Sequence, residues 1–182
     1  MRITGGEARG IQLLVPRFPR FRPTSDRVRS ALFQVISNLL MKARVLDLYA
    51  GSGSLGIEAL SRGAELADFV EMNLVLCRAI RDNLRKTTLD GKGMVRRLSV
   101  GRAITTLKGP YDIILLDPPY NRPDLDETME KLGDSTLLAN KGLIALEHSK
   151  QQVPQQSYGI LEKYSERRYG DTMLTFYREA MS

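Results

Sequence analysis

Apolar residues recur at two different spacings along this chain of 182 residues. From residue 44 onward, short apolar runs typical of buried strands alternate with segments whose apolar residues recur every three or four positions, as on one face of a helix. The predicted strands are 44–50, 66–71, 93–99, 111–117, 142–148, 159–165 and 172–179, and the predicted helices are 55–62, 73–86, 101–107 and 124–132. This alternation predicts an α/β fold with a mostly parallel sheet, helices on both faces and an antiparallel edge made by the last two strands.

The first 43 residues follow a different pattern. Residues 2–6 and 11–16 have strand character around glycines, which predicts a hairpin, and a link rich in Pro and Arg follows. Helical spacing then runs over residues 24–40, after the capping residues Thr24, Ser25 and Asp26. We therefore divide the chain into an N-terminal basic hairpin or arm, residues 1–22, and one main domain, residues 23–182.

Composition limits the class of protein. Hydrophobic residues make up 42% of the chain and charged residues 26%, which is ordinary for a globular protein in water. No apolar run is long enough to cross a membrane, and the N-terminus lacks the apolar stretch of a secretion signal. A single cysteine excludes an internal disulfide and favours a cytoplasmic location.

The positive charge is concentrated near the N-terminus. Residues 1–44 contain nine Lys or Arg against Glu7 and Asp26, a net charge of +7, whereas the remaining 138 residues carry 18 basic and 19 acidic groups, a net charge of −1. Such segregation favours contact with a polyanion, and a solvated basic surface stays open as the alternative. The predicted substrate-binding residues are Arg17, Arg20, Arg22, Thr24 and Arg122.

A glycine-rich turn follows the first parallel strand. Gly51, Gly53 and Gly56 form the pattern G-x-G-x-x-G, and Glu71 ends the next strand twenty positions after Gly51. This pattern is shared by dinucleotide sites, but Asp47 would repel a pyrophosphate. S-adenosylmethionine, with a sulfonium and an ammonium against one carboxylate, suits that carboxylate better. The predicted cofactor-binding residues are Asp47, Tyr49, Gly51, Ser52, Gly53, Glu71 and Ser99.

The segment "LLDPPY", residues 115–120, favours the same chemistry. Two prolines after an apolar strand force the chain to turn away and expose the Asp117 carboxylate and the Pro118 carbonyl at the strand end. Two acceptors can hold the hydrogens of an exocyclic base amine, so that its lone pair faces a methyl donor, and an aromatic ring can stack on the base. The predicted catalytic residues are Asp117, Pro118, Pro119 and Tyr120.

Two other reactive side chains fit structural roles. Cys77 shares a predicted helix face with apolar neighbours, which favours a packed core thiol over a nucleophile. His148, the sole histidine, ends a predicted strand, and the proposed chemistry needs no strong base. No metal is expected, because no Cys, His or Asp cluster has ligand spacing.

Five segments in this order resemble the RsmD family of bacterial 16S rRNA guanine-N2 methyltransferases: "RPTSDRVRSALF", "VLDLYAGSGSLGIEALSRGA", "FVE", "YDIILLDPPY" and "YGDTMLTFY". The resemblance implies a Rossmann-like class I methyltransferase fold with seven strands and an N-terminal β-hairpin extension. It also implies S-adenosylmethionine as cofactor, and 16S rRNA within the small ribosomal subunit or its late precursor as partner. By motif position, Asp47, Gly51 and Gly53 map to the cofactor loop, and Glu71 maps to the acid that holds the ribose.

The sequence departs from the family pattern at two places, and its chemistry admits more than one function. Ser99 stands where similar enzymes commonly carry Asp or Asn to hold the adenine amine, and Ser30 replaces an acid in "DRVRSALF". The same acceptors would also fit an adenine-N6 methyltransferase acting on RNA or DNA. A non-catalytic RNA-binding assembly factor and, more distantly, an NAD-dependent oxidoreductase are also compatible with these motifs.

Overall fold

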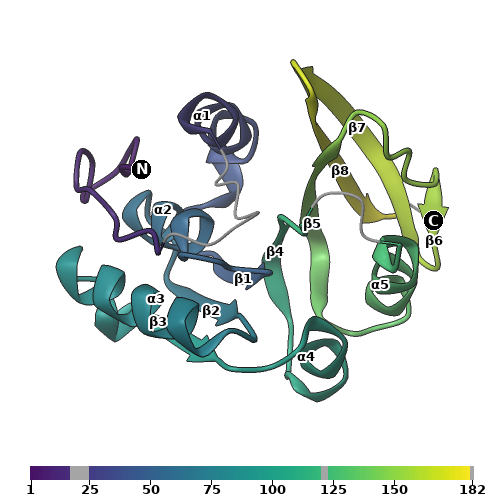
Figure 1. Cartoon of the computed structure of the whole chain (residues 1–182). Helices are drawn as coiled ribbons and strands as arrows, with labels where there is room; N and C mark the ends of the chain where they lie inside the picture. The colour runs from purple at the N-terminus through teal and green to yellow at the C-terminus, as the bar shows by residue number, and fades with distance from the viewer. Residues whose placement is uncertain (17–24, 120–122, 181–182) are drawn as a thin grey trace.

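The computed structural model describes residues 1–16, 25–119 and 123–180. Its strands are β1 (Arg44–Leu48), β2 (Leu66–Val70), β3 (Gly93–Arg96), β4 (Tyr111–Leu116), β5 (Leu138–Ser149), β6 (Ser157–Tyr158), β7 (Leu161–Tyr169) and β8 (Thr172–Glu179). They form one sheet in the order β3-β2-β1-β4-β5-β8-β7-β6 (Figure 1). The first five strands of this order are parallel, and β8, β7 and β6 are added antiparallel.

Three of the five α-helices in the described residues begin at a residue whose side chain caps them. They are α1 (Asp26–Val35), α2 (Ser54–Ser61), α3 (Leu74–Lys86), α4 (Val100–Thr106) and α5 (Leu125–Gly133), with short 3₁₀ turns at Ser37–Leu39 and Asp90–Lys92. Side chains that accept backbone N–H groups cap three of them, Ser25 at α1, Asn73 at α3 and Ser99 at α4. These caps satisfy N–H groups that a helix start leaves without partners.

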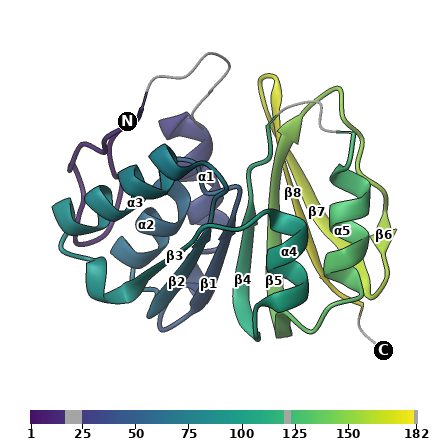
Figure 2. The same cartoon turned by 60° about the horizontal axis from the view of Figure 1, so that its bottom comes forward.

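The sheet separates two hydrophobic cores, because successive residues of a strand point to opposite faces. Val45, Ile113 and Ala145 face a core shared with α1, α2, α3 and the N-terminal segment. Their neighbours in sequence, such as Leu46 and Ile114, face a second core closed by α4 and α5. Figure 2 shows α4 and α5 together on one side of the molecule, apart from α1, α2 and α3. The predicted three-layer α/β arrangement is confirmed.

Several boundaries differ from the prediction. The N-terminal hairpin contains a single antiparallel bridge among its described residues, Arg2 to Gln12, in place of two strands. The helix predicted over 24–40 ends at Val35 and continues as a 3₁₀ turn. β5 begins four residues earlier than predicted, at Leu138, and β6 was not predicted. Because of β6, the described sheet has eight strands in place of seven.

The turn of the closing hairpin is also shorter than predicted. Arg167 and Arg168 lie within β7, so that the reversal falls at Gly170 and Asp171. The proposed domain boundary at 22/23 lies outside the described residues and stays a prediction. Within the described ranges, no helix has the length and apolar character needed to cross a bilayer.

Candidate active site at the ends of the parallel strands

A cavity of about 1060 Å³ opens where β1, β2, β4 and β5 end. This is where β1 and β4 run side by side and their following helices diverge to opposite faces, the usual ligand position in open α/β sheets. Eight of the residues predicted from the sequence line the cavity: Tyr49, Gly51, Ser52, Glu71, Ser99, Asp117, Pro118 and Pro119. The fold therefore brings the predicted cofactor loop and the predicted catalytic motif into one space.

The loop after β1 has an unusual backbone. Tyr49, Gly51 and Gly53 all have positive φ angles, of 61°, 56° and 81°. Glycine adopts this conformation freely, whereas a tyrosine pays of order 1–3 kcal/mol for it. The tyrosine hydroxyl lies 3.4 Å from Thr128 Oγ1 of α5. The third glycine serves packing, because a Cβ at Gly56 would lie 2.3 Å from the Phe69 ring.

Asp47 lies beneath this loop and is not among the residues that line the cavity. It is 1% exposed, and its Oδ2 accepts the Gly56 N–H at 2.9 Å, near the start of α2. Burial raises the pKa of Asp47 to about 8, with the charges of Asp117 and Glu71 adding to the rise. The structure thus gives Asp47 a contact that holds the loop, and its predicted role toward the cofactor stays a prediction.

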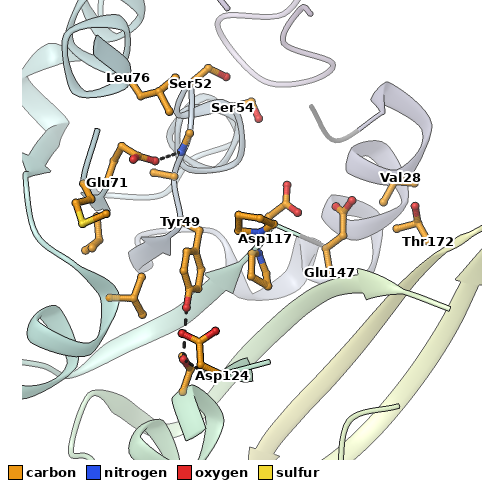
Figure 3. Close-up of a pocket in the computed structure, with 18 of the residues that line it drawn as sticks. Val28, Tyr49, Ser52, Ser54, Glu71, Leu76, Asp117, Asp124, Glu147 and Thr172 are labelled. Atoms are coloured by element: carbon orange, nitrogen blue, oxygen red, sulfur yellow. Dashed lines mark hydrogen bonds between the residues drawn. The ribbon is translucent and has the colours of Figure 1, made fainter. Parts of the chain in front are cut away.

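Glu71 is placed at the cavity wall by two backbone hydrogen bonds. One carboxylate oxygen accepts the Gly51 N–H at 3.0 Å (Figure 3). The other accepts the Asn73 N–H at 2.8 Å. A carboxylate oxygen has more than one lone pair, so each can still accept a ligand hydroxyl. Glu71 therefore joins the glycine loop to the end of β2 in a position suited to a ribose.

The predicted catalytic motif lies across the cavity from Glu71. Asp117 directly follows β4, and Pro118 and Pro119 carry the chain away from the sheet, as expected for residues that cannot continue a ladder. Figure 3 shows the Asp117 side chain projecting into the cavity. Tyr120, Arg122, Arg17, Arg20, Arg22 and Thr24 lie outside the described residues, so their predicted roles stay predictions.

Ser99 has a structural function besides its place in the cavity wall. Its hydroxyl oxygen accepts the Arg102 N–H at 3.4 Å and caps α4. Ser99 departs from the Asp or Asn that is common in similar enzymes, but serine is also a residue type that is favoured at the start of a helix. A contact between Ser99 and a cofactor stays a prediction.

Several lining residues were missed by the sequence reasoning. Glu147 at the end of β5, Thr128 and Lys131 of α5, Arg27 of α1 and the turn 169–172 between β7 and β8 all border the cavity. Arg27 and the turn 169–172 lie in two of the segments that carry the family resemblance, and Glu147 lies near the end of a predicted strand, so these residues carried a signal in the sequence. The others come from elements that only the tertiary structure brings to this end of the sheet.

Cys77 and His148 lie in the core. Cys77 is fully buried, and its thiol donates to the Glu71 carbonyl at 3.2 Å, which confirms the predicted packed thiol. His148 is 2% exposed, with its ring nitrogens 2.9 Å from the Ser149 carbonyl oxygen and 2.8 Å from Thr175 Oγ1. Among the described residues, no group of three or more His, Cys, Asp or Glu is arranged to hold a metal ion.

The charge of the cavity wall tests which cofactor suits it. In the part of the chain that the structure describes, two basic side chains line the cavity, Arg27 and Lys131, against six acidic ones, Glu71, Asp117, Asp124, Glu127, Glu147 and Asp171. An acidic wall disfavours the pyrophosphate of a dinucleotide and favours a ligand with net positive charge. S-adenosylmethionine, with net charge +1 and a ribose for Glu71, fits these residues.

Comparison with known proteins agrees with the fold and the motifs. The family model described as Conserved hypothetical protein 95 matches residues 1–178. Ribosomal RNA small subunit methyltransferase D of Escherichia coli K12 is 42% identical over 150 residues, which cover 81% of this chain and 74% of the relative.

Solved structures extend the similarity to the whole fold. An Escherichia coli protein, yhhF, provisionally named as a methyltransferase, has a TM-score of 0.87 and 33% identity, covering 98% of this chain and 97% of its own. A hypothetical protein of Thermus thermophilus has a TM-score of 0.81 and 32% identity, covering 97% and 98%. The predicted class I methyltransferase fold is confirmed, and the chain belongs to the RsmD family.

Proposed function

We propose that this protein methylates the exocyclic N2 amine of one guanine in 16S rRNA of the small ribosomal subunit, with S-adenosylmethionine as methyl donor. The observation that carries the proposal is the shared cavity in which Asp117 and Pro118 face the glycine-rich loop that joins β1 to α2. The name of the Escherichia coli relative supports ribosomal RNA as the substrate class. Such an enzyme would act in the cytoplasm, on the particle or its late precursor.

Residues on one side of the cavity would bind the cofactor, and residues on the other side would bind the target amine. On the side of β1 and β2, Glu71 would hold the ribose, while the glycines of the loop allow the backbone to approach the ligand closely. When bound, S-adenosylmethionine supplies a methyl group activated by its sulfonium. On the side of β4, the Asp117 carboxylate and the Pro118 carbonyl would accept the two hydrogens of the guanine amine.

These two acceptors would address the main chemical difficulty. The lone pair of a base amine is delocalised into the ring, which makes the nitrogen a poor nucleophile. Acceptors on both hydrogens favour a pyramidal nitrogen and stabilise the positive charge that develops on it. The methylated amine then loses a proton readily, so the buried His148, whose two ring nitrogens have protein partners, is not needed as a base. Tyr120 would stack on the turned-out base.

The decisive experiment incubates the protein with labelled S-adenosylmethionine and undermethylated small-subunit particles and maps the modified nucleoside. We expect N2-methylguanosine at one position of 16S rRNA. N6-methyladenosine as the product would establish the adenine alternative, and RNA binding without label transfer would establish the assembly factor. In calorimetry we expect S-adenosylmethionine to bind much more tightly than NAD, and comparable NAD binding would contradict the proposal.

A further inference from the structure

Glu147 is the carboxyl group that the fold places beside the catalytic motif. It lies near the end of β5, the strand that pairs with β4, and the register that joins Leu116 to Leu146 makes Asp117 and Glu147 neighbours across the two strands. Glu147 is 5% exposed yet lines the cavity. Figure 3 shows the Asp117 and Glu147 side chains both projecting into it.

The other acidic groups of this wall are less suited to a buried polar contact. Asp171 is exposed and pairs with Lys150 Nζ at 2.6 Å, and Glu127 is exposed and pairs with Lys131 Nζ at the same distance. Asp124 is the N-cap residue of α5 and does not lie on a strand next to β4. Glu147 is therefore the acid that combines burial with a place on the strand next to Asp117.

The part of the cavity around Glu147 lies on the side opposite the cofactor loop. Val28 of α1 and Thr172 of β8 border it, and both are drawn near Glu147 in Figure 3. A carboxylate with so little exposure to water is stabilised by each hydrogen-bond donor that reaches it. A base that enters beside Asp117 would bring such a donor if its Watson–Crick edge carried an N–H.

Guanine and adenine differ at N1, the ring position next to the amine. The N2 amine of guanine is flanked by N1–H, a donor, whereas the N6 amine of adenine is flanked by the N1 lone pair, an acceptor. A carboxylate next to the amine site would accept from guanine N1–H and would repel adenine N1. We propose that Glu147 reads the N1–H of the target base and so selects guanine over adenine. The inference rests on the proposed function and adds the residue that determines the base.

The test uses 2,6-diaminopurine, which keeps the N2 amine but has an acceptor at N1. Small-subunit particles are reconstituted with either guanine or 2,6-diaminopurine at the position mapped for the wild-type enzyme. We expect the wild-type enzyme to prefer guanine by about tenfold to a hundredfold in kcat/KM, as for loss of one hydrogen bond to a charged group. In Glu147→Gln the amide can donate to N1 of 2,6-diaminopurine, so the preference should fall to within about threefold or reverse.

The matched control is Glu162→Gln, an exposed position on β7 that does not line the cavity. It should keep the wild-type preference, and both variants should keep the wild-type melting temperature and affinity for S-adenosylmethionine. An unchanged guanine preference in folded Glu147→Gln would overturn the inference while leaving the proposed function intact. Failure of the wild-type enzyme to methylate guanine at all would instead overturn the proposed function, and with it this role of Glu147.

Discussion

Three carboxyl groups at the ends of neighbouring strands have different environments. Glu71 is partly exposed and accepts two backbone N–H groups, whereas Asp117 is partly exposed at the proposed catalytic motif. Asp47 is buried, and its pKa is raised by that burial and by the charges of the other two. The same functional group is thus suited to hold a ligand, to orient an amine and to fix a loop.

Asp117→Ala should separate chemistry from cofactor binding. We expect methyl transfer to rRNA to fall by at least about a hundredfold, as for loss of one preorganised polar group, with S-adenosylmethionine affinity nearly unchanged. Single-turnover kinetics on small-subunit particles and calorimetry measure the two quantities. Asp117→Asn, which keeps an acceptor oxygen, is the matched control and should retain a trace of activity. Wild-type turnover in Asp117→Ala would show that the motif has another role.

The raised pKa of Asp47 predicts a pH dependence of stability. The carboxyl has a pKa of about 8 when folded, against an ordinary value of 3.8. Between these values the folded chain holds a proton that the unfolded chain releases, so this contribution to stability is present below about pH 4 and is lost as the pH rises toward 8. The free energy of unfolding should fall across this range by up to about 1.4 kcal/mol per pH unit from this group.

Urea unfolding of wild-type protein and Asp47→Asn from pH 4 to 8 measures this contribution by difference. The asparagine keeps an acceptor for the Gly56 N–H and cannot titrate. The free energy of unfolding of Asp47→Asn should therefore fall less than that of the wild type between pH 4 and 8. His148 acts in the opposite sense, because burial lowers its pKa and its contribution is lost as the pH falls below its usual range. Parallel curves for the two proteins would show that Asp47 is ionised in the folded state.

At the scale of elements, the N-terminal segment is held to α1 and α2 by buried charges. Glu58 of α2 accepts the Thr4 N–H at 2.8 Å and lies 3.3 Å from Arg29 Nε of α1, with both charged side chains fully buried. Arg29 also donates to the Arg2 carbonyl, and Arg62 Nε lies 2.8 Å from Glu58. One buried carboxylate therefore joins three segments of the chain.

A second polar contact joins the same segment to the loop after β1. The fully buried Asn83 of α3 accepts the Leu14 N–H at 2.7 Å and donates to the carbonyl oxygens of Leu14 and Ser52, at 2.9 and 3.0 Å. These bonds fix the described end of the N-terminal segment against the loop after β1. The described N-terminal segment is thereby coupled to the loop at Ser52, which lines the cavity.

Removing one partner of the buried ion pair should cost more than replacing both. We expect Glu58→Leu alone to lower the free energy of unfolding by about 3–5 kcal/mol, because it leaves the Arg29 guanidinium buried with less compensation. The double variant Glu58→Leu with Arg29→Met should recover a substantial part of that loss. Denaturant unfolding of the four proteins in the cycle measures the coupling. Additive losses would show that the pair does not act as a unit.

At the scale of the whole molecule, opposite charges serve different parts of the protein. The cavity wall is acidic, which suits a cationic cofactor, whereas the chain before residue 45 has a net charge of +7. Both features suit methylation of an rRNA substrate. Basic side chains of the protein can bind the RNA phosphates, and an acidic cavity attracts the cationic methyl donor. The described part of the N-terminal segment packs on α2 and α3, through the contacts of Thr4 with Glu58 and of Leu14 with Asn83.

The basic link is tested best by charge reversal. Changing Arg17, Arg20 and Arg22 to Glu should leave the melting temperature and S-adenosylmethionine affinity intact while weakening association with the rRNA substrate. The salt dependence of this association should flatten by roughly one unit of slope for each phosphate that the variant no longer binds. A matched control reverses three arginines of α3, Arg78, Arg81 and Arg85, which are exposed and do not line the cavity. If rRNA affinity and its salt dependence are unchanged in the first variant, the RNA binds to another surface of the protein.

Local pattern was sufficient for most of the fold. Apolar periodicity located the five parallel strands and the helices between them, because each such element must bury one or two faces against a neighbour. Apolar periodicity failed to locate a very short strand, and it failed where pairing with a distant segment sets the end of a strand. The two-residue β6 has no period to detect, and the start of β5 at Leu138 depends on pairing with Tyr111.

The residues of the candidate site also fall into two groups, those that the sequence predicts and those that only the tertiary structure brings together. The glycine loop, Glu71 and the motif at Asp117 were identified from the sequence, since each places a chemically distinctive residue type directly after an apolar strand. Tertiary structure alone decided that Asp47 turns beneath the loop toward Gly56, and that α1, α5 and the turn at 169–172 complete the wall. It also decided that Glu147 stands beside Asp117, because strand order and register are set by packing between segments far apart in the sequence.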